Sequence, residues 1–175
     1  MEKTNEVVEI PAEGVEDKNI DTTQFLTFHL GNEIYGIEVN NVREVIEYEN
    51  VHEIPMVPEF IRGVINLRGE VVPVIDLSYR FYKTKCEETK FTCIVIVELE
   101  EENETLLIGF VIDAINAVTD IPDDSIEPTP GFGAKIRADF ISGVGKVRDK
   151  FIILLNLGKV LDVEELSNFE GMMEE

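Results

Sequence analysis

Three short segments of this chain contain residue types that could bind phosphate, a dinucleotide or calcium. The segment SGVGKV at 142–147 pairs glycine with lysine, but Val147 stands where a phosphate-binding loop needs the Ser or Thr that reaches magnesium. The segment GFGAK at 131–135 lacks the third glycine of a dinucleotide loop. The acidic segment DIPDDSIE at 120–127 contains Pro122 and lacks the central glycine of an EF-hand. We therefore interpret 142–147 as containing a β-turn and 120–127 as a solvated acidic loop.

The histidines and cysteines do not form a catalytic or metal-binding pattern. His29 falls in an expected strand and His52 in an irregular segment, without HxxxH spacing or a GxSxG motif near either. Cys86 and Cys93 fit neither a CxxC redox motif nor a zinc site. Catalysis and metal binding both need converging groups, so we predict no catalytic residue, no metal and no cofactor.

The composition excludes several classes of partner. The 175-residue chain has a formal net charge of −21 and 44% hydrophobic residues. It can bury a core, but its charge would repel nucleic acid and anionic membrane surfaces. Its start has no basic segment followed by an apolar one, and no apolar run of ~18 residues occurs elsewhere. We expect a globular cytoplasmic protein that binds neither nucleic acid nor membranes directly.

Short apolar, β-branched runs follow an acidic start at residues 1–22, which has the composition of a disordered tail. FLTFHL at 25–30 and EIYGIEV at 33–39 predict a hairpin around Gly31-Asn32. NNVREVIEY at 40–48 has helical spacing and predicts a short helix or turn. The remaining runs predict strands at 71–77, 92–99, 106–113 and 151–157, with a hydrophilic hairpin tip at 100–104 and a C-terminal helix at 162–173.

An internal repeat sets the expected architecture. FIRGVINLRGEVVPVIDL at 60–77 aligns without gaps on FISGVGKVRDKFIILLNL at 140–157, and YGIEVNNV at 35–42 resembles IGFVIDAI at 108–115. Two similar β units therefore follow one another, and we predict two small β-barrels packed side by side.

A polar break, Asn66-Leu67-Arg68-Gly69, interrupts the first copy of the repeat. The chain is expected to turn here, with Gly69 at positive φ and Arg68 projecting outward. From the residues alone, an ordinary hairpin turn is the favoured interpretation, because turns that contain glycine are common.

The segment GVINLRGEVVPVIDL at 63–77 resembles the hallmark of CheW-type coupling domains. The resemblance continues through 25–46, 53–63 and 108–118, in the order typical of that family, and covers residues 24 to about 166. It implies a mainly β fold of two tandem SH3-like five-stranded barrels around a shared hydrophobic core, with short helices. Together with the repeat, it gives a domain over 23–175 with barrels at roughly 30–90 and 91–160.

The resemblance also implies a function and a set of site residues. Similar proteins are non-catalytic chemotaxis adaptors that bind the hairpin tip of a chemoreceptor and the regulatory domain of a CheA-type histidine kinase, at membrane-associated receptor arrays. The positions that match the family's partner-sensitive residues are Val42, Glu44, Gly63, Asn66, Leu67 and Arg68.

Within this set we expect Arg68 to pair with Glu44 near a binding surface and Val42 to contribute to a receptor groove. Alternatively, Val42 is a core residue and the pair is an exposed contact worth ~0–1 kcal/mol. Two other functions stay open: a similar adaptor in another two-component pathway, controlling surface motility or development, and a small enzyme using carboxylates between the barrels.

Overall fold

The computed structural model describes residues 21–101, 103–128 and 138–160. Their elements, in chain order, are β1 (Thr22–Leu30), β2 (Glu33–Glu38), the 3-10 helix η1 (Val39–Asn41), β3 (Val42–Glu47), β4 (Ile61–Leu67), β5 (Glu70–Asp76), α2 (Leu77–Tyr82), β6 (Cys93–Glu101), β7 (Glu104–Ile112), β8 (Ala114–Pro122), η2 (Asp123–Ser125), β9 (Ile126–Glu127), η3 (Ala138–Phe140), β10 (Ile141–Val147), β11 (Lys150–Leu155) and α3 (Leu157–Val160).

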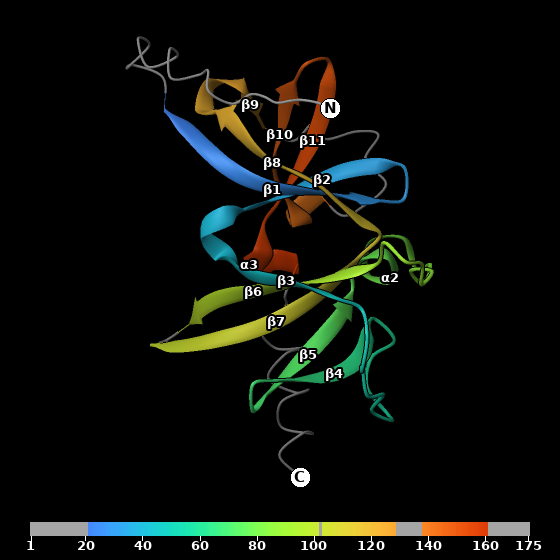
Figure 1. Cartoon of the computed structure of the whole chain (residues 1–175). Coiled ribbons are helices and arrows are strands. Elements are labelled where there is room, and N and C mark those ends of the chain that lie inside the picture. The colour runs from blue at the N-terminus through green and yellow to red at the C-terminus, as the bar shows by residue number, and fades with distance from the viewer. Residues whose placement is uncertain (1–20, 102, 129–137, 161–175) are drawn as a thin grey trace.

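The strands form two sheets that lie one above the other in Figure 1. One sheet has the order β8-β1-β2-β11-β10-β9 and the other β3-β6-β7-β5-β4. Each curls until its ends meet: β9 continues from β8 and pairs with β10, and His52, which follows β3, pairs with Val64 of β4. We call them the A barrel and the B barrel. The mainly β fold of two barrels is thus confirmed, with a short sixth strand in the A barrel.

Three groups of buried side chains hold this arrangement together. Phe25, Ile121, Ile152 and Leu154 pack inside the A barrel, and Ile65, Val72, Val74, Cys86, Ile94, Ile96 and Val111 pack inside the B barrel. The largest group, which we call the shared core, includes Phe28, Tyr35, Phe60, Phe110 and Phe140 and draws on both sheets. At about 25 cal/mol per Å² of buried apolar surface, a core between the barrels stabilises their contact strongly.

The predicted barrel boundaries at roughly 30–90 and 91–160 are wrong, because the two repeats exchange their first hairpins. The hairpin β1–β2 of the first repeat joins β8, β10 and β11 of the second in the A barrel. The hairpin β6–β7 of the second repeat joins β3, β4 and β5 of the first in the B barrel. Only η1 separates β2 from β3 and only Asp113 separates β7 from β8, so the chain crosses between barrels at these two points.

The repeat is still visible in matching local geometry. The Asp76 N–H donates to the Phe60 carbonyl at 2.7 Å, and the Asn156 N–H donates to the Phe140 carbonyl at 2.8 Å. The parallel ladders also correspond, with Val74 opposite Gly109 in one barrel and Leu154 opposite Gly36 in the other. The alignment of 60–77 on 140–157 therefore reflects the same supersecondary unit used twice.

Two local predictions are corrected by the structure. Residues 42–47 form the strand β3 and not a helix, because pairing with the apolar strand β6 overrides the helical spacing of Val42, Val45 and Ile46. Residues 142–147 lie within β10, and the turn comes after them, at Arg148 and Asp149, both with positive φ.

The other strand predictions are confirmed within one to three residues at their ends. The segment 120–127 closes β8, forms η2 and opens β9, so only its centre is irregular. β1 begins at Thr22, inside the predicted tail of 1–22, while the rest of that tail up to residue 20 and the predicted helix at 162–173 lie outside the described residues.

Candidate interaction surface

The β4–β5 turn places Arg68 against Glu44. Arg68 and Gly69 have φ of 51° and 90°, which is the pattern of a tight two-residue hairpin turn, and the Gly69 N–H donates to the Asn66 side-chain oxygen at 2.9 Å. This side-chain contact fixes the turn. The predicted positive φ of Gly69 and the outward direction of Arg68 are therefore confirmed.

The guanidinium of Arg68 binds the Glu44 carboxylate through both terminal nitrogens. Nη1 lies 2.8 Å from Oε2, and Nη2 lies 2.6 Å from Oε1. The Arg68 side chain is 69% exposed and that of Glu44 26%. Because solvent screens such a pair, it contributes ~0–1 kcal/mol to stability, and its geometry matters more for presenting charge than for holding the fold.

The other predicted site residues have different surroundings. Leu67 is half-buried, packs on the interior of the B barrel, and lines a small pocket with Arg43, Glu44, Arg68, Glu70 and Leu107. Val42 is half-buried against the shared core. A bulge separates it from Glu44 in the β3–β6 ladder. The structure therefore brings together Glu44, Asn66, Leu67 and Arg68, with Val42 at the edge of the shared core.

Gly63 has a backbone reason to be glycine. Its φ is +147°, and a Cβ at this position would lie 2.1 Å from the carbonyl oxygen of His52. That oxygen accepts the Val64 N–H at 2.9 Å in the bridge that closes the B barrel. Gly63 thus allows the closure and lies away from the ion pair.

A buried polar network at the opposite end of β5 from this turn was missed by the sequence analysis. Asp76 is fully buried and accepts hydrogen bonds from the N–H groups of Tyr79 at 3.1 Å and Cys86 at 3.0 Å. The Arg62 guanidinium lies 3.3 Å from the same carboxylate and also donates to the Tyr48 hydroxyl and the Cys86 carbonyl. The sequence did contain one sign of this network. Asp76 directly follows the apolar run VVPVI, and a carboxylate buried with such a strand needs a partner for its charge.

The network continues from the B barrel to the A barrel through Cys86. Its thiol donates to Oδ1 of Asp113 at 3.1 Å, and Oδ2 of Asp113 accepts the Gly31 N–H at 2.8 Å. Burial, followed by the neighbouring Asp113 carboxylate, raises the pKa of Cys86 to about 12, so its thiol stays protonated at neutral pH. Burial and Glu47 also raise the pKa of Cys93.

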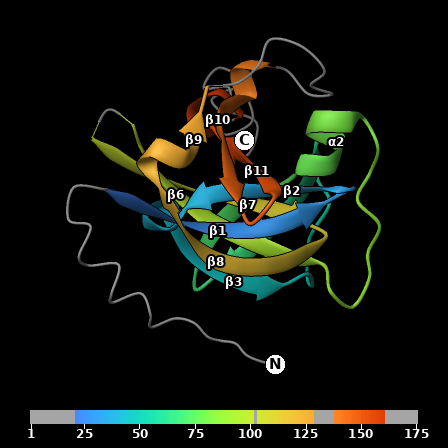
Figure 2. The same cartoon turned by 90° about the horizontal axis from the view of Figure 1, so that it is seen from above.

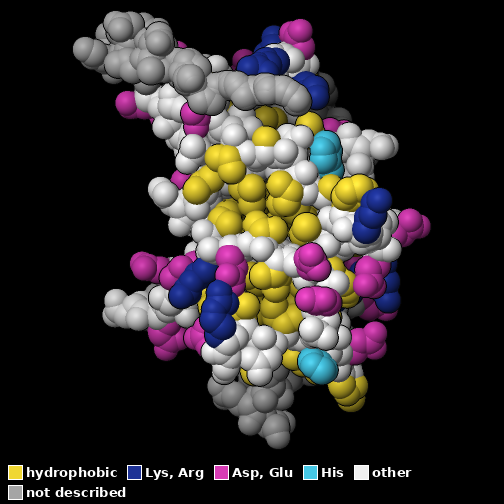
Figure 3. Space-filling model, in the orientation of Figure 1, with side chains coloured by type: hydrophobic (Ala, Val, Ile, Leu, Met, Phe, Trp, Pro, Cys, Tyr) yellow, Lys and Arg dark blue, Asp and Glu magenta, His cyan; other side chains and the backbone are white. Residues whose placement is uncertain are grey.

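One face of the molecule carries an apolar surface that spans both barrels. Figure 3 shows hydrophobic side chains gathered there in the view of Figure 1, and Figure 2 shows β3 and β8 on the same side of the molecule. These edge strands carry the exposed residues Val45, Ile115 and Val118, the last 57% exposed. We call Val45, Ile115 and Val118 the edge-strand surface. Exposed apolar side chains gathered on one face favour an interaction site there.

No helix in the described ranges is long and apolar enough to cross a membrane. Among the same residues, no group of three or more His, Cys, Asp and Glu side chains is placed to hold a metal ion.

Comparison with known proteins identifies the family. Residues 24–165 match the model of the CheW-like domain. This chain belongs to the CheW family. It is 33% identical over 144 residues to a chemotaxis protein CheW of Klebsiella aerogenes, covering 82% of this chain and 84% of that protein. It is 28% identical over 158 residues to a chemotaxis protein CheW of Treponema pallidum, covering 88% and 91%.

A solved CheW structure has the same fold. The crystal structure of the scaffolding protein TtCheW from Thermoanaerobacter tengcongensis superimposes with a TM-score of 0.74 at 36% identity, over 83% of this chain and 91% of that chain. The two-barrel architecture described above is thus the architecture of a CheW-family scaffold.

Proposed function

We propose that this chain is a non-catalytic chemotaxis adaptor that couples chemoreceptors to a CheA-type histidine kinase in signalling arrays. The observation that carries the proposal is the match to the CheW-like domain across both barrels. The chain supports a binding role in its own right, since it presents an apolar surface on the edge strands and a charged turn beside it. A cytoplasmic location at membrane-associated arrays, reached through its partners, follows from the same proposal.

The edge-strand surface is the proposed contact for the receptor's helical hairpin tip. A helix docks by placing apolar side chains from successive turns against such a surface, while charges at its rim set register and partner choice. Val45 and Val118 supply exposed apolar area on the two barrels, and Val42, on the same strand as Val45, packs against the shared core. In this role, Val42 affects the affinity through the shape of the surface.

The turn at Asn66–Gly69, with Glu44, is proposed as a second contact region that discriminates between partners. The bidentate pair holds the Arg68 guanidinium in one orientation, so that its remaining surface can face a partner.

The test is co-sedimentation of purified protein with a membrane-embedded chemoreceptor and a CheA-type kinase from the same genome. We expect the chain to increase both the kinase recovered with the receptor and receptor-dependent control of autophosphorylation. Folded protein that binds neither partner, under conditions in which another CheW protein works, would contradict the adaptor role.

Val118→Glu should weaken receptor binding at least tenfold, because it places a charge in an apolar contact whose burial contributes about 1.5–3 kcal/mol per side chain. The measurement is the receptor concentration that recovers half of the protein in the pellet. The matched control is Phe151→Glu, since Phe151 is similarly exposed at 61% but lies on β11. An equal loss in both variants would rule out a specific role for β8.

Exchanging the charges of Glu44 and Arg68 tests the second contact region. Each of Glu44→Arg and Arg68→Glu should lower kinase recovery severalfold, because two like charges then face each other at the turn. The double variant should recover part of the binding through the restored pair. Stability should change by no more than ~1 kcal/mol in all three, since the pair is exposed. Without rescue in the double variant, the pairing has no role in binding.

A further inference from the structure

Strand β7 has an open edge at its beginning. It pairs with β6 along its whole length from Glu104 to Ile112, but its parallel ladder with β5 begins only at Gly109. In the A barrel the corresponding ladder between β2 and β11 begins at Ile34, the second residue of β2. Among the described residues, the stretch 104–108 therefore has a strand neighbour on one side only, and Figure 1 shows the β6–β7 hairpin projecting past β4 and β5.

The gap beside this edge stays open because β5 cannot continue the ladder. Pro73 precedes the first paired residue, Val74, and its carbonyl oxygen lies 3.6 Å from the place of a Cβ on Gly109. Proline has no N–H to donate to a neighbouring strand. A pocket of about 240 Å³ remains between the strands, lined by Glu70, Val71, Val72, Pro73, Thr105, Leu106 and Leu107.

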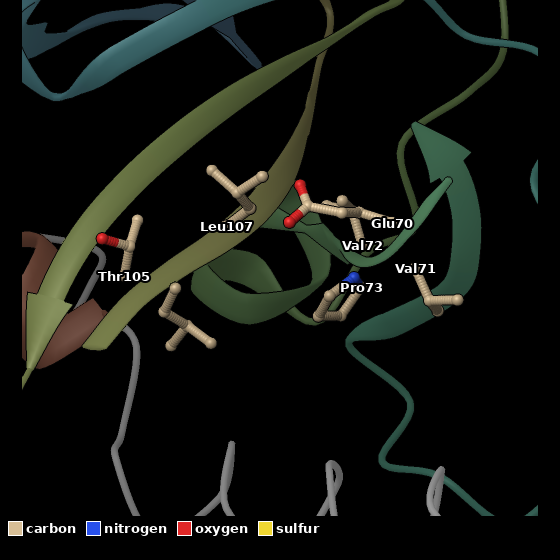
Figure 4. Close-up of a pocket in the computed structure, with 7 residues that line it drawn as sticks. Glu70, Val71, Val72, Pro73, Thr105 and Leu107 are labelled. Carbon is tan, nitrogen blue, oxygen red and sulfur yellow. The ribbon is translucent and has the colours of Figure 1, made fainter. Parts of the chain in front are cut away.

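The lining of this pocket combines an apolar floor with one acidic residue, Glu70, and a second, Glu104, lies nearby on β7. Val71 is 55% exposed, and Leu106 and Leu107 are half-buried. Figure 4 shows the side chain of Glu70 extending toward Leu107 across the gap. Glu104, at the start of the open edge, is exposed. An extended segment beside β7 would place alternate side chains over the apolar floor and the others near these carboxylates.

We propose that this open edge of β7 binds an extended, basic segment of a partner protein by strand addition. Main-chain hydrogen bonds to residues 104–108 would supply affinity, and alternate apolar side chains would fill the pocket, as in other strand-addition complexes. This contact is separate from the edge-strand surface and does not depend on the adaptor function proposed above.

Charge favours a basic partner segment over either terminus of this chain and over a second copy. Residues 1–20 contain six acidic side chains and two lysines, and residues 161–175 contain six acidic side chains and no Lys or Arg. A second copy of the chain carries the same formal charge of −21. Glu70 and Glu104 would repel all three, which also protects an exposed edge against self-association. A basic segment is the occupant that the acidic rim attracts.

The probe is a short peptide of alternating lysine and valine, titrated into the full chain while backbone amide exchange is followed by NMR. We expect amide exchange across 104–108 to slow at least tenfold at saturation, with little change along β2. A glutamate–valine peptide of the same length should have no effect. Slowed exchange spread over the acidic surface, without preference for β7, would overturn the proposal.

Two pairs of variants make the test specific. Val71→Lys should weaken peptide binding at least tenfold, whereas Phe151→Lys, at the equivalent position of the second repeat, should change it less than twofold. Glu104→Lys and Glu33→Lys are a second pair, since each residue is exposed and begins the second strand of its hairpin. Equal losses of peptide affinity within both pairs would show that the peptide is attracted by overall charge and would contradict the strand-addition site.

Discussion

Replacing Asp76 by alanine is expected to lower the free energy of unfolding by about 3–5 kcal/mol, the usual cost of removing one partner of a buried ion pair. The Asp76 carboxylate is fully buried, and the Arg62 side chain is only 17% exposed. Without Asp76, the Arg62 guanidinium loses its counter-charge, and the N–H groups of Tyr79 and Cys86 lose their acceptor. Urea unfolding followed by circular dichroism measures the difference.

Glu44→Ala is the matched control for Asp76→Ala, because it also removes a carboxylate from an arginine. It should cost no more than ~1 kcal/mol, since Arg68 is exposed and regains water. A double variant, Arg62→Met with Asp76→Asn, should recover part of the stability, because it removes both buried charges together. If Asp76→Ala cost as little as Glu44→Ala, the buried network would have no structural role.

Gly63→Ala is expected to destabilise the protein by about 3 kcal/mol or more, through backbone strain and a direct clash. The alanine Cβ would lie 2.1 Å from the His52 carbonyl oxygen and 3.1 Å from the Glu53 Cα, both of which belong to backbone that cannot turn aside as a side chain can. The closure of the B barrel between His52 and Val64 should open. The measurement is amide hydrogen exchange at Val64, which should accelerate as this part of the barrel loses stability.

Gly69→Ala tests the cost of a positive φ for alanine without a steric clash. Gly69 also has a positive φ, of +90°, but nothing lies within 4 Å of the place of its Cβ. Its replacement should therefore cost only about 1 kcal/mol, the conformational penalty alone. Equal costs at the two positions would show that the contact with His52 is relieved by a small backbone shift.

The sequence predicts most strands of this fold but not their assignment to barrels. Alternation and β-branched runs locate β1, β2, β5, β6, β7 and β11, because strand formation follows local patterns of burial. The exchange of hairpins depends on which strands meet in space, and a repeat in the sequence is equally compatible with exchanged and unexchanged pairing. The error at β3 has the same origin, since its pairing with β6 comes from the other repeat.

The candidate surface was predictable to a similar extent. The turn at Arg68 follows from Asn66 and Gly69, and its contact with Glu44 was expected from the family resemblance. The network around Asp76 joins residues from β4, α2 and the segment before β6, whose proximity no spacing in the sequence reveals. The open edge of β7 likewise depends on where a ladder begins, although Pro73 is a visible sign that a strand lacks a donor.

The hairpin exchange also fixes when each barrel can be completed during synthesis. The B barrel lacks β6 and β7 until residues up to 112 have left the ribosome, although β3, β4 and β5 emerge earlier. The A barrel begins with β1 and β2, but the neighbour of β2 in the sheet, β11, is available only after residue 155 has been made. Since nascent chains grow at about 5–20 residues per second, the first hairpin waits several seconds without its β11 neighbour. The acidic residues along the chain would then keep neighbouring nascent copies apart during that interval.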